Sequence, residues 1–90
     1  MPRTYIALDL ETTGLSPERD AIIEVGAVKY QDGRAVETFS SLVNPGRPIP
    51  YDITLITGIR NEDVLGKPAF EQVAPGFRHF VGPAAIVGQN

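Results

Sequence analysis

The chain has 90 residues, of which 42% are hydrophobic and 21% are charged, and its formal net charge is −3. This length allows one small domain, and the composition excludes an intrinsically disordered chain. The sequence contains no cysteine, which excludes a disulfide framework and a thiolate metal site. The acidic balance argues against a broad basic surface that would hold nucleic acid through its phosphates.

The residue pattern shows neither a membrane segment nor a secretion signal. No apolar run approaches the roughly 20 residues that a transmembrane helix needs. The N-terminus lacks the charged-then-apolar pattern of a signal peptide. We therefore expect a cytoplasmic protein that makes no membrane contact.

The first half of the chain predicts strands joined by short connections, which imply antiparallel pairing. These strands cover residues 3–9, 21–30 and 34–43. The Gln-Asp-Gly at 31–33 is a hairpin signal between the second and third strands. Residues 12–20 form a turn-rich loop, in which Gly14 is free to adopt a positive φ.

The second half changes to a helical pattern. Residues 44–50 are rich in proline and predict a rigid, extended loop. Beyond it, we expect Asn61 to cap a short helical turn over residues 62–65, which Gly66 ends.

A longer helical face follows, because apolar residues recur at spacings of three and four. They are Phe70, Val73, Phe77 and Phe80. Pro75 and Gly76 interrupt this pattern, so we expect a kink or a break between two short helices. Residues 84–87 then predict a fourth strand, which a right-handed crossover would place beside the first strand and parallel to it.

Two acidic residues, Asp9 and Glu11, end the first apolar run. Side chains two apart on a strand point to the same face, which places these Cα atoms about 7 Å apart. The two carboxylates repel each other, and a divalent cation between them relieves the repulsion. The alternative is that both are solvated acids at an ordinary strand end.

Four segments in order resemble a known family. They are Asp-Leu-Glu-Thr-Thr-Gly-Leu at 9–15, Ile-Ile-Glu-Val-Gly-Ala-Val at 22–28, Leu-Val-Asn-Pro-Gly at 42–46 and Ile-Thr-Gly-Ile at 56–59. Together they resemble the N-terminal part of a DEDD-type (DnaQ-like) 3′→5′ exonuclease domain. Such domains include the proofreading epsilon subunit of bacterial DNA polymerase III and exonucleases fused to helicases.

The resemblance implies a fold and an extent. The fold would be an α/β, ribonuclease-H-like fold with three antiparallel strands, then a helix and a parallel fourth strand. Residues 1–90 would be the N-terminal portion of a single exonuclease domain, truncated before the sheet is covered.

The resemblance also implies metal-dependent hydrolysis of phosphodiester bonds at nucleic-acid 3′ ends. Family members hold two Mg²⁺ or Mn²⁺ ions between four carboxylates. Asp9 and Glu11 match the first two carboxylates, as catalytic residues and metal ligands. No residue up to Asn90 matches the others, so half of the ligands are present and we expect these 90 residues to be inactive alone.

Two further segments are candidates for binding the terminal nucleotide. By resemblance, one wall of the site comprises Thr12, Thr13, Gly14 and Leu15, and the facing wall comprises Ile56, Thr57 and Gly58. The alternatives are a Thr-Gly turn that ends a strand and a helix stop capped by Gly58.

Two other polar residues are candidates for roles near the site. Glu24 interrupts an apolar strand, either as a neighbour of the metal site or as an outward-facing carboxylate. His79 is the only histidine, and we interpret it as a solvated surface residue rather than a general base.

The expected partner is a nucleic-acid 3′ end, with single-stranded DNA favoured over RNA. A polymerase or helicase region of a parent protein is a second expected partner. An oligoribonuclease-like trimmer of RNA ends stays open as an alternative. A hypothesis of another class is a non-catalytic module that keeps the fold and binds nucleic acid or protein.

Overall fold

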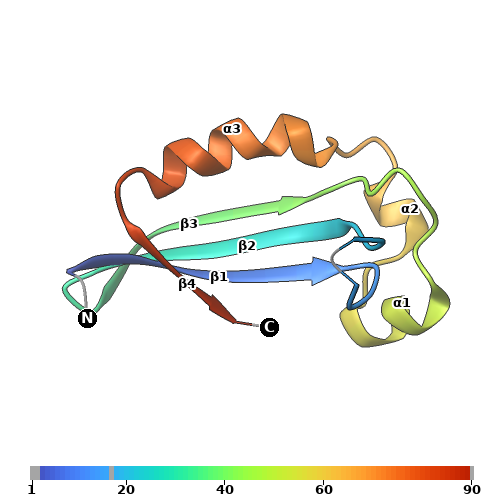
Figure 1. Cartoon of the computed structure of the whole chain (residues 1–90), viewed down its shortest axis with the longest axis horizontal. Helices are drawn as coiled ribbons and strands as arrows, with labels where there is room; N and C mark the ends of the chain where they lie inside the picture. The colour runs from blue at the N-terminus through green and yellow to red at the C-terminus, as the bar shows by residue number, and fades with distance from the viewer. Residues whose placement is uncertain (1–2, 17, 90) are drawn as a thin grey trace.

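Four strands form one mixed sheet, which the computed structural model describes over residues 3–16 and 18–89 (Figure 1). The strands are β1 (Thr4–Thr12), β2 (Ile22–Gln31), β3 (Arg34–Leu42) and β4 (Ala85–Gln89). The order across the sheet is β3-β2-β1-β4. β2 pairs antiparallel with β1 and with β3, whereas β4 pairs parallel with β1. The topology predicted from the sequence is therefore confirmed.

Three helices lie between β3 and β4 in the chain. They are α1 (Tyr51–Thr57), α2 (Asn61–Val64) and α3 (Phe70–Val81). α3 runs along one side of the sheet, while α1 and α2 lie beyond the end at which β1 finishes (Figure 1). None of the helices in the described residues is long and apolar enough to span a membrane.

Alternation along the strands builds the core beneath α3. Ile6 on β1 and Ala27 on β2 pack with Phe80 and Val81 of α3. Farther along the sheet, Val25, Val43 and Val73 form a second buried group. A third group joins β2 to α1 and α2, and its buried members are Ile23, Ile49, Ile59 and Val64. The helices therefore cover one face of the sheet and one of its ends.

The predicted break in the long helix is wrong, because α3 continues from Phe70 to Val81 with Pro75 inside it. Proline removes the hydrogen bond that would reach the carbonyl of Glu71. Glu71 and Pro75 are both exposed, so water can satisfy that carbonyl. Val73 and Phe80 are buried on the opposite side and hold the helix to the sheet.

Two local expectations also need correction. Asn61 does not cap α2, since Arg60 occupies the N-cap position. The Asn61 amide oxygen instead accepts a hydrogen bond from the Ile49 backbone N–H at 2.7 Å and ties the preceding loop to α2. Gly14 is not among the glycines with positive φ, so a close contact explains glycine there.

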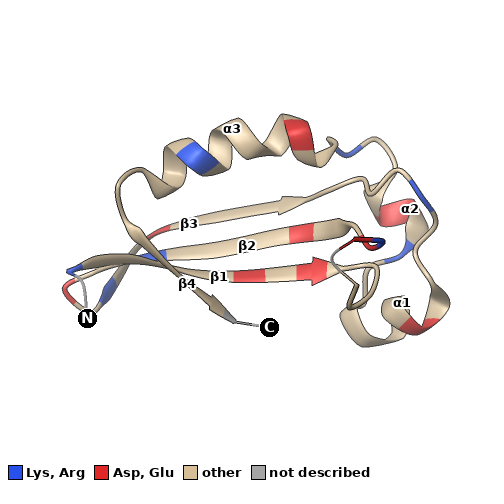
Figure 2. Ribbon diagram, in the orientation of Figure 1, with Lys and Arg blue, Asp and Glu red and all other residues tan. Residues whose placement is uncertain are grey.

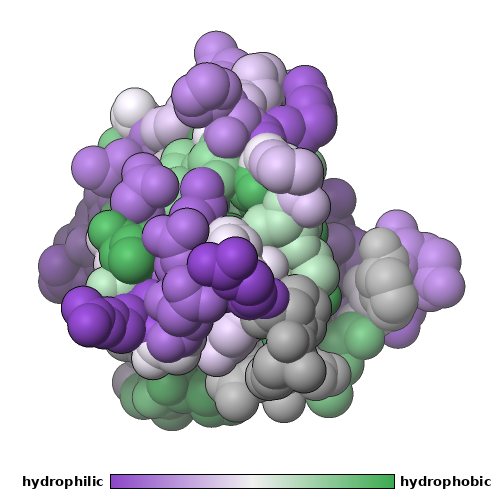
Figure 3. Space-filling model, turned by 90° about the vertical axis from the view of Figure 1, so that its left-hand side faces the viewer, coloured by the Kyte–Doolittle hydropathy of each residue, from purple (hydrophilic) through white to green (hydrophobic). Residues whose placement is uncertain are grey.

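The β2–β3 hairpin lies at the other end of the sheet from α1. Asp32 and Gly33 both have positive φ, as a two-residue hairpin turn requires. Asp32 pairs with Arg3 at 3.0 Å, and this hydrogen bond raises the pKa of the Arg3 guanidinium. Figure 3 views this end of the molecule, where the surface is largely hydrophilic with smaller apolar patches.

Two isoleucines at matched positions in the β1–β4 register test the core assignment. Ile6 is 0% exposed and its β4 partner Ile86 is 49% exposed. Ile6→Ala should lower the free energy of unfolding by about 2–5 kcal/mol, because it leaves a cavity under α3. Ile86→Ala should cost about 1 kcal/mol or less in the same urea titration. Equal losses would contradict the described core.

Candidate active site

Asp9 and Glu11 lie on the face of β1 that α3 leaves uncovered. Leu8 and Leu10 alternate with them along the strand and pack into the clusters beneath α3. Asp9 is exposed and Glu11 is half-buried. No ion pair within residues 3–16 and 18–89 includes either carboxylate. Both acids are thus available to bind a cation.

The strand that carries these acids is longer than the sequence predicted. β1 continues to Thr12, so both acids are inside the ladder, where Asp9 opposes Gly26 and Glu11 opposes Glu24. The register shifts between Glu11 and Thr12, where the strands begin to separate. Pairing on the β2 side holds the backbone of both acids, which a loop could not do as firmly.

Glu24 adds a third negative charge beside this pair. Figure 2 shows its red segment of β2 next to the acidic segments of β1. Like charges directly opposite one another destabilise an antiparallel pair, and a bound cation would relieve this repulsion. Within the described part of the chain, however, no three acidic, histidine or cysteine side chains converge to hold a metal. The structure therefore supports the pair Asp9 and Glu11, rather than a group of three, as the candidate metal ligands.

This donor set fits a hard divalent cation. Carboxylate oxygens are the ligands that Mg²⁺ and Mn²⁺ prefer, and these ions commonly take only one or two carboxylates from a protein. Asp9 and Glu11 provide two such groups on one face of one strand, at the edge of a cleft.

The cleft has a volume of about 620 Å³ and lies between the end of β1, the following loop and α1. Its lining residues are Asp9, Leu10, Glu11, Thr12, Gly14, Leu15, Ser16, Asp20, Ile22, Ile53, Ile56 and Thr57. The acids thus share one cleft with apolar side chains from two segments that are far apart in the sequence. Leu15 and Ile56 are 102% and 79% exposed, so both present apolar surface to a ligand.

Most of the predicted substrate-binding residues come together in this cleft. Thr12, Gly14 and Leu15 line it from the loop side, and Ile56 and Thr57 line it from α1. Thr13 and Gly58 are not among the lining residues.

These two residues have structural contacts instead. Thr13 is 4% exposed and its hydroxyl donates to the Asp20 carboxylate at 3.0 Å. Gly58 ends α1 with a φ of 77°, and its N–H donates to the Thr54 carbonyl. The interpretation of Gly58 as a helix cap therefore matches the structure. Nucleotide binding by either residue stays a prediction.

Both threonine hydroxyls in the cleft already make hydrogen bonds within the protein. The Thr12 hydroxyl donates to the Gly14 carbonyl across the turn. The Thr57 hydroxyl donates to the Ile53 carbonyl at 2.9 Å and accepts the Ile59 N–H at 3.1 Å. Each hydroxyl thus shapes its own wall of the cleft.

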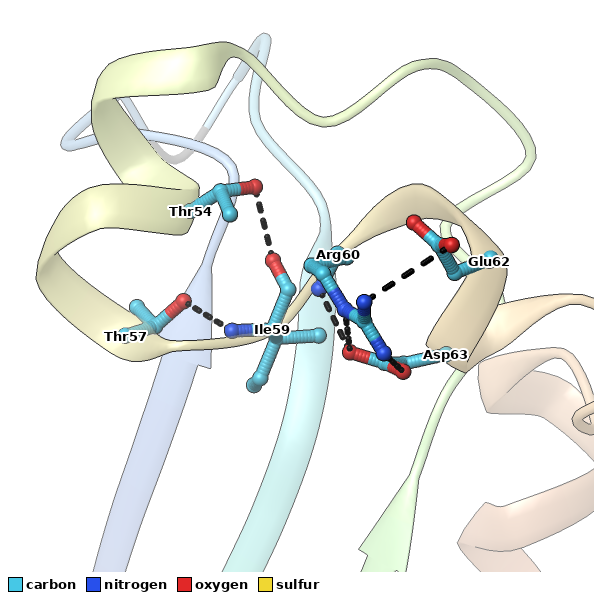
Figure 4. A network of polar contacts seen from close by, with 6 residues as sticks. All are labelled: Thr54, Thr57, Ile59, Arg60, Glu62 and Asp63. Atoms are coloured by element: carbon cyan, nitrogen blue, oxygen red, sulfur yellow. Dashed lines mark hydrogen bonds and ion pairs between the residues drawn. The ribbon is translucent and has the colours of Figure 1, made fainter.

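A polar network between α1 and α2 supports the α1 wall (Figure 4). Thr54 donates to the Ile59 carbonyl at 2.7 Å, and Asp63 accepts the backbone N–H of Arg60 at 2.8 Å. The Arg60 guanidinium also pairs with Asp63 at 3.1 Å. These hydrogen bonds from Arg60 lower the pKa of the Asp63 carboxyl. The network connects residues 54–63 into one unit that presents Ile56 to the cleft.

Two polar residues of the cleft, Ser16 and Asp20, were not predicted from the sequence. Asp20 lies two residues before β2, and a carboxylate at that point can accept hydrogen bonds from the loop that returns to β1. An acidic residue just before the second strand was therefore the feature of the sequence that could have indicated this contact. A second hollow of about 320 Å³ lies near the start of α3 and contains Glu71 but neither acid of β1. It therefore offers no carboxylate pair.

Comparison with known proteins identifies the family. A family model described as "RNase_T: Exonuclease" matches residues 6–90. The chain belongs to this exonuclease family. The resemblance to DEDD-type exonuclease domains is thereby confirmed.

Among curated proteins, the chain is 46% identical over 86 residues to the PolC-type DNA polymerase III of Clostridium perfringens. That match covers 96% of this chain and 6% of the polymerase. The chain is also 42% identical over 85 residues to the DNA polymerase III epsilon subunit of Aquifex aeolicus. This second match covers 94% of this chain and 42% of the subunit. The chain thus spans less than half the length of either relative.

A solved structure supports the same assignment. Exonuclease X in complex with 5′ overhanging duplex DNA superposes with a TM-score of 0.81 and is 35% identical. The match covers 96% of this chain and 48% of that one. The four-stranded mixed sheet with its helices is therefore a ribonuclease-H-like exonuclease fold.

The Arg60–Asp63 pair predicts a pH dependence of stability. Because folding lowers the pKa of Asp63, its contribution is present above the ordinary carboxyl pKa and is lost as the pH falls through the lowered value. Asp63→Asn should lower Tm near pH 7 and have a smaller effect near pH 3. Thermal melts of the wild type and of Asp63→Asn at both pH values test this. A Tm difference between the two proteins that is the same at both pH values would contradict the pair's role.

Proposed function

We propose that the chain is part of a metal-dependent 3′→5′ exonuclease that removes nucleotides from DNA 3′ ends during proofreading or repair. The observation that carries this proposal is the carboxylate pair, Asp9 and Glu11, in a cleft with exposed apolar walls. Membership of the exonuclease family and the polymerase relatives support it.

Each part of the cleft has a role in the proposed reaction. Asp9 and Glu11 would hold Mg²⁺ or Mn²⁺ against the scissile phosphate. When bound, such ions lower the pKa of an attacking water and stabilise the leaving 3′ oxygen. Leu15 and Ile56 would contact the sugar and base of the terminal nucleotide from opposite walls, which orients the phosphate and excludes water.

The extent of the active unit is also a proposal. Residues 1–90 would form the N-terminal portion of one exonuclease domain and supply half of a two-metal site. These 90 residues alone would then have negligible nuclease activity. A polymerase region, or a helicase region, of the parent protein would deliver the 3′ end, in the cytoplasm.

Substitution of the two acids tests the proposed function in the full-length natural protein that contains this sequence. Asp9→Asn and Glu11→Gln keep the side-chain size and remove the negative charge. Each should reduce kcat by about a hundredfold to a thousandfold, because the fixed charges act on the transition state. The measurement is the shortening, in Mg²⁺, of single-stranded DNA labelled at its 5′ end. A matched RNA strand is assayed in parallel.

A neighbouring acid provides the control. Glu18 is exposed on the loop between β1 and β2 and does not line the cleft, so Glu18→Gln should keep the wild-type rate. The 5′ label should remain on a ladder of shortening products. Release of the label as a mononucleotide at the outset would overturn the 3′→5′ polarity. Wild-type rates in both acid variants would overturn the active site.

A further inference from the structure

We propose that Asp20 is a positioning residue of the cleft, which orders residues 13–16 and thereby holds Leu15 where the terminal nucleotide binds. The proposal rests on the proposed function, because it assigns how one wall of that site is built. Asp20 lies two residues before β2 and is one of the residues that line the cleft.

The Asp20 carboxylate connects both ends of this segment. Its Oδ1 accepts the Thr13 hydroxyl at 3.0 Å, and its Oδ2 accepts the Ser16 backbone N–H at 2.8 Å. The Thr13 hydroxyl in turn accepts the Ala21 N–H at 2.9 Å. Backbone bonds add to this tie, since the Asp20 N–H donates to the Ser16 carbonyl at 2.8 Å. One carboxylate therefore ties the loop to the residues that directly precede β2.

Gly14 fits into this arrangement through its lack of a side chain. A Cβ at Gly14 would lie 2.6 Å from Asp20 Oδ2 and 2.8 Å from Asp20 Cγ. Contacts under 3.0 Å force a displacement, so with any larger residue at position 14 either the Asp20 carboxylate or the loop must move and their contact is disturbed. The Asp20 side chain thus lies directly against the backbone that precedes Leu15.

Leu15 depends on the order of its own backbone. Its side chain is 102% exposed, so no packing contact fixes its position. The backbone on both sides, at Gly14 and Ser16, is the backbone that Asp20 contacts. A group ordered before binding avoids the entropy cost of ordering it on binding. Asp20 therefore affects substrate affinity through Leu15, with no contact to the reacting atoms.

Three variants of the full-length natural protein test this mechanism: Asp20→Asn, Leu15→Ala and the two combined. Asparagine keeps the size but has one acceptor oxygen where aspartate has two. It can therefore accept the Thr13 hydroxyl or the Ser16 N–H, but not both. Each single variant should raise KM for single-stranded DNA about tenfold and change kcat less than about twofold. The KM of the double variant should be no higher than that of Leu15→Ala, because both changes remove the same contact.

A further variant, Gly14→Ala, covers the case in which Asp20→Asn does not fold. Gly14→Ala disturbs the same contact from the loop side and should give the same rise in KM. Glu18→Gln exchanges an exposed carboxylate of the same loop for an amide whose oxygen can still accept the Ser16 hydroxyl, so it should leave KM unchanged. The dissociation constant of a fluorescent oligonucleotide, measured in EDTA, provides a readout that requires no catalysis.

The outcomes separate this proposal from the proposed function. A wild-type KM in Asp20→Asn, a loss of kcat alone, or losses that multiply in the double variant would overturn the positioning role. An inactive wild-type protein would instead count against the proposed function. In that case the EDTA titration still decides the role of Asp20, because unchanged oligonucleotide binding in Asp20→Asn would overturn it.

Discussion

The alternation of a β-strand fixes the relation between the core and the candidate site. Residues two apart on β1 share a face, so Asp9 and Glu11 point away from α3 while Leu8 and Leu10 point toward it. A shift of the β1 register by one residue would bury the acids and expose the leucines. Burial of the apolar set therefore also sets the direction of the two carboxylates, and the site depends on the stability of the sheet.

Hydrogen bonds order both walls of the cleft, and on the α1 side they add to the buried apolar group that joins β2 to α1 and α2. On one side, Asp20 ties the loop to the segment just before β2. On the other, the Thr57 hydroxyl and the Arg60–Asp63 pair order the passage from α1 to α2. This arrangement leaves the apolar side chains of Leu15 and Ile56 free at the surface. Exposed apolar groups on an ordered backbone suit a ligand with flat apolar faces, such as a nucleotide base.

Features with a local cause could be predicted from the sequence. Strand alternation and the Asp-Gly turn at 32–33 depend on neighbouring residues, so the strand order and the shared face of Asp9 and Glu11 follow from them. The end of β1 was placed too early, because its last residues are held by pairing with β2. Pro75 was expected to break a helix whose buried face instead keeps it continuous.

Features that depend on contacts across the fold could not be predicted. Gly14 is required by the Asp20 side chain rather than by its own φ, and that contact exists only once β1 and β2 pair. Likewise, Asn61 contacts residue 49 instead of capping its own helix. Thr13 illustrates the same limit, because its place in a Thr-Thr-Gly motif does not reveal that its hydroxyl is buried against Asp20.

The proposed chemistry requires a divalent cation between the two acids of β1, and paramagnetic broadening by Mn²⁺ measures this binding residue by residue. In NMR spectra of the chain titrated with Mn²⁺, amide signals should broaden first around Asp9, Glu11 and Gly26, which faces Asp9 across the ladder. Asp9→Asn should weaken this broadening. Broadening centred on other carboxylates, such as Glu62 and Asp63, and unaffected by Asp9→Asn would rule out a cation site at Asp9 and Glu11.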